Sequence, residues 1–117
     1  MNDWAEIEGV QKHVCSRFGS PFRPCSVEQT IALPEDISSD KLPINGLRVA
    51  PRGEHSGWFI WLGEGLNQAD DYFKPHHTAH LPQLREEVLP FLGLEVGWRF
   101  LVAPGHLDVW FDESLLN

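Results

Sequence analysis

The sequence predicts an α+β fold, in which an antiparallel β-sheet packs against two helices in a single domain of 117 residues. Three observations lead to this class. Apolar residues recur every three to four positions in 4–18 and 81–92, which is typical of amphipathic helices. Apolar runs separated by turn residues predict hairpins at 44–62 and 98–112. The composition, 42% hydrophobic and 22% charged, is that of a globular domain.

The N-terminal helix is predicted from Trp4 to Phe18, because its apolar residues fall on one stripe. The stripe consists of Trp4, Ile7, Val10, Val14 and Phe18. Gly19 followed by Pro21 can end this helix. A connector, a short strand at 27–33 and a polar loop at 35–43 are expected to follow.

The central strand is expected at Trp58–Leu62, which is apolar at every position. Such a run belongs to a strand covered on both faces rather than to a solvated edge. The preceding strand, 44–49, is joined to it by a loop rich in turn residues.

A second helix is predicted over 81–92. Its apolar stripe is formed by Leu81, Leu84, Val88 and Leu92. Arg85 is expected on the opposite, polar side with Glu86 and Glu87. Pro90 should tighten the last turn, and Gly93 should end the helix.

The last hairpin is predicted with its register. Pro104 and Gly105 suit a type II turn, which sets Ala103 opposite His106. One side of the hairpin is then apolar and is expected to belong to the core; it is formed by Trp98, Phe100, Val102, Leu107, Val109 and Phe111. On the other side, Arg99 lies opposite Trp110, and Leu101 lies opposite Asp108.

Two interpretations of that second side remain open. Arg99 could stack on Trp110 and still reach Asp108 or Asp112, so that the indole is held ready as a binding anchor. Alternatively, the second helix covers this side, and Trp110 belongs to the core with Arg99 as its buried partner.

The charge distribution excludes several classes of partner. The net charge is −8, with nine acidic and three basic residues in 59–117 alone. Nucleic acid and anionic membranes would be repelled by that half of the chain, so neither is expected to bind. A basic protein would be attracted, although the charge can also serve solubility alone.

The cysteines and the first residues indicate a cytoplasmic protein. Cys15 and Cys25 are ten positions apart, which fits neither a zinc motif nor a redox pair, so free and inert thiols are expected. The N-terminal residues lack the basic and apolar segments of a signal peptide, and no apolar run reaches membrane-spanning length.

The histidine cluster is the one candidate for metal chemistry. On a helix, His76 and His80 would share a face and provide half of a metal site. A third ligand for this metal site could come from Asp70, Asp71 or His106. The other interpretation is that these histidines bind no metal and make ordinary hydrogen bonds at a helix end.

No nucleophile with a base and no phosphate-binding loop occurs in the sequence, so we expect neither enzymatic activity nor a cofactor. Aromatic residues beside acids instead suggest a surface for a protein partner. The candidate residues of this surface are Trp61, Glu64, Asp70, Asp71, Tyr72, Arg99, Asp108, Trp110 and Asp112.

Several sequence blocks resemble a known family. They are Pro43-Ile44-Asn45-Gly46-Leu47-Arg48, Gly57-Trp58-Phe59-Ile60-Trp61 with Gly63-Glu64, Asp71-Tyr72-Phe73-Lys74-Pro75 with His77 and His80-Leu81, Val88 to Leu94, Gly97 to Leu101, and Asp108 to Asp112. Over about 43–116 the chain resembles immunity-protein family thirty-three, and its thirty-three-like relatives, of bacterial polymorphic toxin systems. Residues 1–42 then form an N-terminal helix and connector before the family-like core.

The resemblance implies a cytoplasmic bacterial protein that neutralises a cognate toxin by stoichiometric binding and has no enzymatic activity of its own. Given the charge of this chain, the toxin is expected to be basic. The chain departs from the usual pattern at His76, where an apolar residue is common. The alternative function is a small-molecule- or metal-binding regulatory domain that uses His76, His77 and His80, and a hydrolase is a third.

Overall fold

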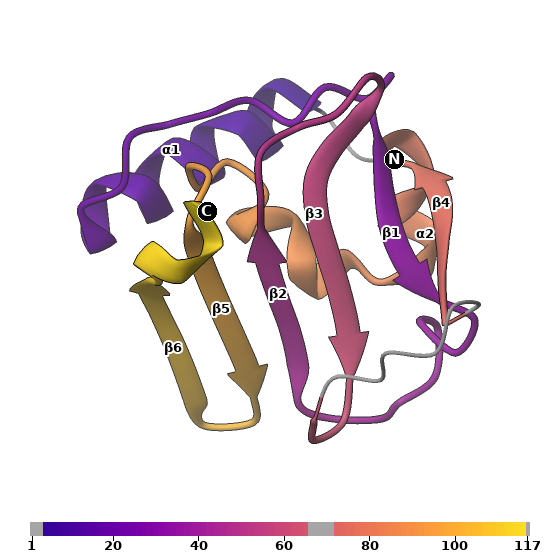
Figure 1. The fold of residues 1–117 in the computed structure, drawn as a ribbon. Helices are drawn as coiled ribbons and strands as arrows, with labels where there is room; N and C mark the ends of the chain where they lie inside the picture. The colour runs from indigo at the N-terminus through magenta and orange to yellow at the C-terminus, as the bar shows by residue number, and fades with distance from the viewer. Residues whose placement is uncertain (1–3, 66–71, 117) are drawn as a thin grey trace.

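The computed structural model describes residues 4–65 and 72–116. A six-stranded β-sheet forms the centre of the fold (Figure 1). The strand order is β4-β1-β3-β2-β5-β6. The strands are β1 (Thr30–Pro34), β2 (Ile44–Arg48), β3 (His55–Leu62), β4 (Phe73–His77), β5 (Trp98–Ala103) and β6 (His106–Phe111).

The sheet is mixed rather than wholly antiparallel. β1 and β3 run parallel, while every other neighbouring pair is antiparallel. The α+β class is therefore confirmed, and the expectation of a wholly antiparallel sheet is wrong at this one pair. β2 and β3 form an antiparallel hairpin. The other edge of β3 pairs with β1, and these two strands run in the same direction.

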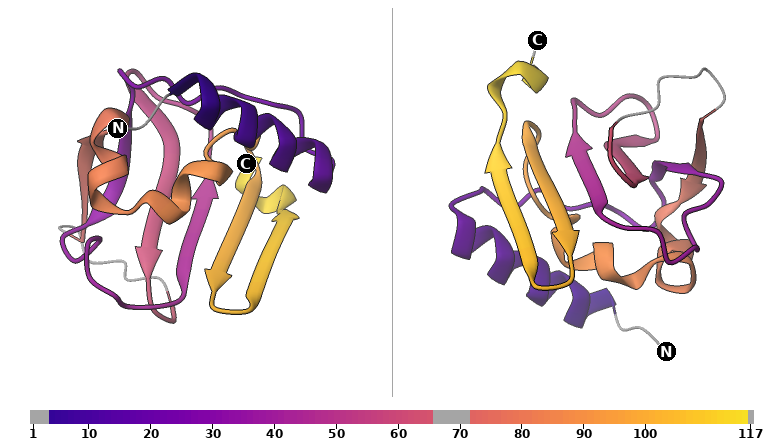
Figure 2. Two further views of the ribbon diagram at one scale, coloured as in Figure 1. Left: turned by 180° about the vertical axis from the view of Figure 1, so that it is seen from behind. Right: turned by 90° about the horizontal axis from the view of Figure 1, so that it is seen from below.

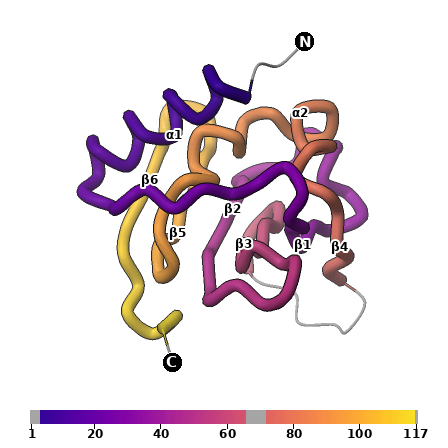
Figure 3. Tube along the Cα trace, turned by 90° about the horizontal axis from the view of Figure 1, so that it is seen from above, coloured from indigo at the N-terminus to yellow at the C-terminus, as the bar shows by residue number. Residues whose placement is uncertain are grey.

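The helices lie on one face of the sheet (Figures 2 and 3). They are α1 (Trp4–Phe18) and α2 (Leu81–Leu84), with the 3-10 helices η1 (Thr78–His80) and η2 (Glu86–Phe91). A third 3-10 helix, η3 (Glu113–Leu116), lies on the other side of the sheet. Within the described ranges, no helix combines the length and the apolarity needed to cross a membrane.

The helix α1 has the bounds expected from its apolar period, but its buried side is shifted. Val10 is exposed, whereas Gln11 and Cys15 are buried. Gln11 Nε2 donates a hydrogen bond of 2.9 Å to the Leu89 carbonyl, and Cys15 Sγ donates one of 3.2 Å to the Gly93 carbonyl. These two contacts attach α1 to η2 and to the residues that follow it.

The second helical region is broken where a single helix was expected. α2 ends at Leu84, Arg85 adopts φ −161° and ψ 84°, and η2 begins at Glu86. The break turns Arg85 inward, so its expected place on the polar side is wrong. Only 7% of Arg85 is exposed.

The core fills the space between the helices and the central strands. β3 is central, as the sequence predicts, and Trp58, Ile60 and Leu62 belong to the buried cluster. Trp58 Nε1 donates a hydrogen bond of 3.0 Å to the Leu92 carbonyl, which shows that this side of β3 faces the helices. Gly46 lies directly beneath a ring, because a Cβ there would come within 2.2 Å of Phe100.

Arg48 is a buried cation that sequence analysis did not identify. It is 1% exposed, and its hydrogen bonds to the described residues all go to backbone carbonyls. The acceptors are Ser56 at 3.1 Å from Nε, Arg23, Leu92 and Leu94 at 2.9, 3.1 and 2.8 Å from Nη1, and Pro24 at 3.1 Å from Nη2. Burial lowers the pKa of Arg48 to about 10, so the group stays positive at neutral pH.

Candidate protein interface

The β5–β6 hairpin forms with the register expected from its turn residues. All six predicted pairs are present, from Trp98 opposite Phe111 to Ala103 opposite His106. β6 lies at the edge of the sheet. The hairpin has an apolar side, which includes Phe100, and an opposite side, which includes Arg99 and Trp110. The two sides differ in how far other elements cover them.

The apolar side of the hairpin is only partly buried. Phe100 is buried, whereas Leu107 is exposed and Phe111 is 47% exposed. The expectation that this whole side is core is therefore wrong for Leu107 and Phe111. The buried cluster reaches β6 only through the partly buried Val109, so the edge strand extends past the packed layer.

The opposite side of the hairpin carries an ordered tryptophan. Trp110 is 39% exposed, and the Arg99 guanidinium lies 5.4 Å from its ring centroid. Arg99 Nη1 also donates a hydrogen bond of 3.0 Å to Asp112 Oδ2. Since the helices α1 and α2 lie on the other face of the sheet, the second helix does not cover Trp110 (Figure 2).

Asp112 fixes this arrangement from the end of β6. Its Oδ1 accepts hydrogen bonds from Ser114 Oγ at 2.6 Å and from the Ser114 amide at 3.1 Å. The hydrogen bond from Ser114, followed by that from Arg99, lowers the pKa of Asp112. Sequence analysis missed the role of Ser114, although an aspartate carboxylate often accepts a hydrogen bond from the backbone amide two residues on.

Asp108 lies on the same side of β6. It pairs with His106, whose Nε2 is 2.8 Å from Asp108 Oδ2, and both side chains are exposed. Together with Asp112, Asp108 places negative charge on both sides of Trp110 along the strand. We call Arg99, Asp108, Trp110 and Asp112 the hairpin surface.

The remaining predicted interface residues lie near the other edge of the sheet or in its interior. Trp61 is 4% exposed, so the expectation that it offers a ring to a partner is wrong. Glu64 is exposed, and Tyr72 is half-buried with its ring 4.8 Å from that of Phe73 in β4. Asp70 and Asp71 lie outside the described residues.

The histidines do not form the expected helical pair. His76 lies in β4 and His80 in η1, so the two do not share a helix face. The expected geometry is wrong because Pro75 and its neighbours pair with β1 as an extended strand. His77 and His80 have ring centroids 5.8 Å apart. In the described part of the chain, no three metal-ligating side chains come together.

The two cysteines are buried, and neither forms a disulfide. Cys25 Sγ lies 3.5 Å from the Thr78 hydroxyl. Desolvation raises the pKa of both thiols, which disfavours the reactive thiolate. No sulfur-based chemistry is supported by this environment.

Comparison with protein-family models identifies the family of this chain. Residues 10–112 match the Imm33-like domain. The chain belongs to this family. The match to the Imm33-like domain covers most of the chain, includes the greater part of α1 and ends at Asp112, so it contains the whole hairpin surface. The family name points to an immunity role. Comparison with curated proteins and with solved structures finds no match.

Proposed function

We propose that this Imm33-like protein is a cytoplasmic immunity protein that neutralises a cognate bacterial toxin by stoichiometric binding. Family membership supports the immunity role. The observation that supports the binding surface is Trp110, an exposed indole beside the Arg99 guanidinium, which also pairs with Asp112, on the helix-free side of the hairpin. In this proposal the protein neutralises the toxin by binding to it, without catalysing a reaction.

The hairpin surface suits an anchor residue. Tryptophan and arginine are enriched among the residues that contribute most to protein binding. Because Arg99 and Asp112 already restrict the Trp110 ring, little side-chain entropy is lost when a partner covers it.

Charge supports a basic partner. The net charge is −8, and Asp108 and Asp112 border the exposed ring. Opposite charges across an interface accelerate association and exclude wrong partners. A basic face on the toxin would meet both requirements.

One partner can also contact the second group of candidate residues. Five strand spacings of about 4.8 Å separate the two edges of the sheet by roughly 24 Å. A standard interface of about 800 Å² per partner is wide enough to span that distance. We therefore include Glu64 and Tyr72 in a second contact region, with Asp70 and Asp71, which precede Tyr72 in the sequence, as further members.

Co-expression tests the immunity role directly. If a neighbouring gene encodes the cognate toxin, that toxin should arrest growth when it is produced alone, and this protein should restore growth and co-purify with the toxin in a one-to-one complex. Failure to restore growth, together with the absence of a complex, would contradict the proposal.

Two hairpin variants test the surface. Trp110→Ala should weaken toxin binding by about 2 kcal/mol or more, roughly thirtyfold, while the fold stays intact. Phe111→Ala is the matched control, because Phe111 is a neighbouring aromatic residue of similar exposure on the other side of β6. If Trp110→Ala instead loses about 3–5 kcal/mol of stability and its folded fraction binds normally, the anchor is wrong.

A further inference from the structure

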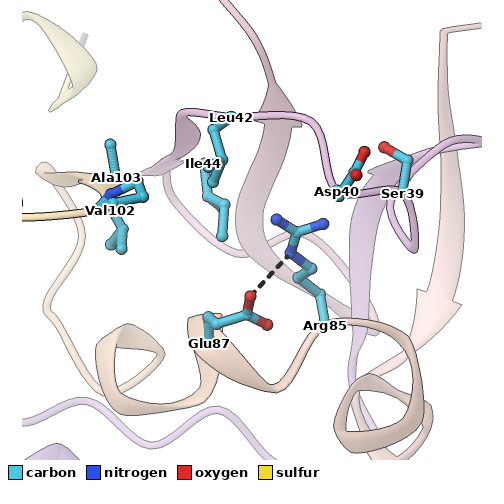
Figure 4. A pocket seen from close by; sticks show the side chains of 9 residues that line it. Ser39, Asp40, Leu42, Ile44, Arg85, Glu87, Val102 and Ala103 are labelled. Atoms are coloured by element: carbon cyan, nitrogen blue, oxygen red, sulfur yellow. Dashed lines mark ion pairs between the residues drawn. The ribbon is translucent and has the colours of Figure 1, made fainter.

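A pocket opens on the protein away from the hairpin surface. It has a volume of about 530 Å³ and lies between the loop before β2, the start of η2 and the β5–β6 turn (Figure 4). It is lined by Ser39, Asp40, Leu42, Ile44, Arg85, Glu87, Val102, Ala103 and Pro104. Its volume falls within the range of roughly 300–1,000 Å³ that is typical of small-molecule sites.

Arg85 forms the buried, charged part of this pocket. The break between α2 and η2 turns it inward, and its Nε is buried without a hydrogen-bond partner among the described residues. Nη1 and Nη2 have only long contacts, of 3.5 Å to the Ile37 carbonyl and 3.3 Å to the Lys41 carbonyl. A guanidinium in this state lacks a strong acceptor, and a carboxylate is the acceptor that its planar fork fits best.

Glu87 does not supply that acceptor. Its Oε2 lies 3.4 Å from Arg85 Nε but outside hydrogen-bond geometry, and its side chain is half exposed. An exposed carboxylate at that distance gains little from the pair. A ligand carboxylate could therefore displace Glu87 from Arg85 and leave Glu87 free for another contact.

The walls of the pocket are aliphatic, and its rim is acidic. Ile44 and Val102 are directly paired between β2 and β5, and Leu42 lies beside them. The side chains of Asp40 and Glu87 are exposed at the opening, where they favour a ligand with a positive group. The pocket thus offers a cation, two carboxylates and an aliphatic wall to a single ligand.

We propose that this pocket binds an aliphatic zwitterion, either a free amino acid of the leucine type or a short peptide of such residues. The ligand carboxylate pairs with Arg85, its ammonium group contacts Glu87 and Asp40, and its side chain packs on Ile44 and Val102. The site shares no residue with the hairpin surface, so it does not depend on the proposed toxin binding.

Calorimetry and NMR of the arginine Nε–H signals test the site with four probes: L-leucine, the dipeptide Leu-Leu, isocaproate, which lacks the ammonium group, and isoamylamine, which lacks the carboxylate. Leucine or Leu-Leu should bind and shift the Arg85 signal, and whichever binds tighter identifies the source. Isocaproate and isoamylamine should each bind about tenfold more weakly or worse, because each loses a charged contact.

Variants separate the two charged contacts. Glu87→Gln should weaken leucine or Leu-Leu about tenfold and leave isocaproate no weaker, while Glu86→Gln, on the neighbouring exposed residue outside the lining, should change neither. Arg85→Gln should abolish binding, and if that variant does not fold, the Glu87→Gln comparison still decides. The proposal is overturned if neither leucine nor Leu-Leu binds, if isocaproate binds as tightly as they do, or if Glu87→Gln binds them normally.

Discussion

Arg48→Met should strongly destabilise the protein without changing the volume of the core greatly. The arginine donates to five backbone carbonyls. Leu92 keeps the hydrogen bond from Trp58, so four carbonyls lose a donor, two of them at buried contacts (Ser56 and Leu94) and two at part-buried ones (Arg23 and Pro24). At about 1 kcal/mol for each carbonyl left without a donor, the loss is about 4 kcal/mol.

Urea and thermal unfolding measure this loss. For a domain of this length, about 4 kcal/mol corresponds to a fall in Tm of roughly 15 °C. Arg48→Lys should recover little of it, because one ammonium group cannot replace the planar fork that reaches carbonyls in several directions. Arg52→Met is the control, since Arg52 is exposed and its replacement should stay within about 0.5 kcal/mol. If Arg48→Met unfolds within about 1 kcal/mol of the wild type, the carbonyls do not need this donor and the reasoning is refuted.

Three further predictions concern charge and thiols. The association rate with the toxin should fall as salt rises, and a rate independent of salt would exclude electrostatic steering. The lowered pKa of Asp112 gives stability that is present above about pH 4 and is lost as pH falls through its folded pKa, so Asp112→Asn should flatten that part of the acid-unfolding curve. Cys15 and Cys25 should resist Ellman's reagent in the native protein and react in urea, and rapid native labelling would contradict their burial.

Sequence patterns predicted correctly the elements that are determined by interactions between residues close together in the chain. The bounds of α1 follow from a 3.6-residue period with Gly19 after its end, and every pair of the β5–β6 hairpin follows from Pro104 and Gly105. The opposition of Arg99 and Trp110 was therefore available from the sequence, because register determines which residues share a side.

The sequence could not show which face of the sheet the helices cover, or how far they cover it. The alternation of residues along the strands predicts that Leu107 and Phe111 share a side with Phe100. Leu107 and Phe111 are nevertheless exposed, because β6 lies at the edge of the sheet. In the same way, the uncovered state of Trp110 depends on the helices packing against the opposite face. Burial is decided by which elements meet, and those contacts join residues far apart in the chain.

The sequence by itself determined the α+β class, the first helix, the register of the last hairpin and the acidic charge of the chain. The tertiary structure decided the parallel pairing of β1 and β3, the break that buries Arg85 and the burial of Arg48. Periodicity places charged residues on the solvent side by default, because an unpaired charge is costly to bury. Arg48 is an exception because carbonyls from distant segments converge on it, and that convergence exists only in the folded chain. Arg85 is an exception because the break between α2 and η2 turns it inward.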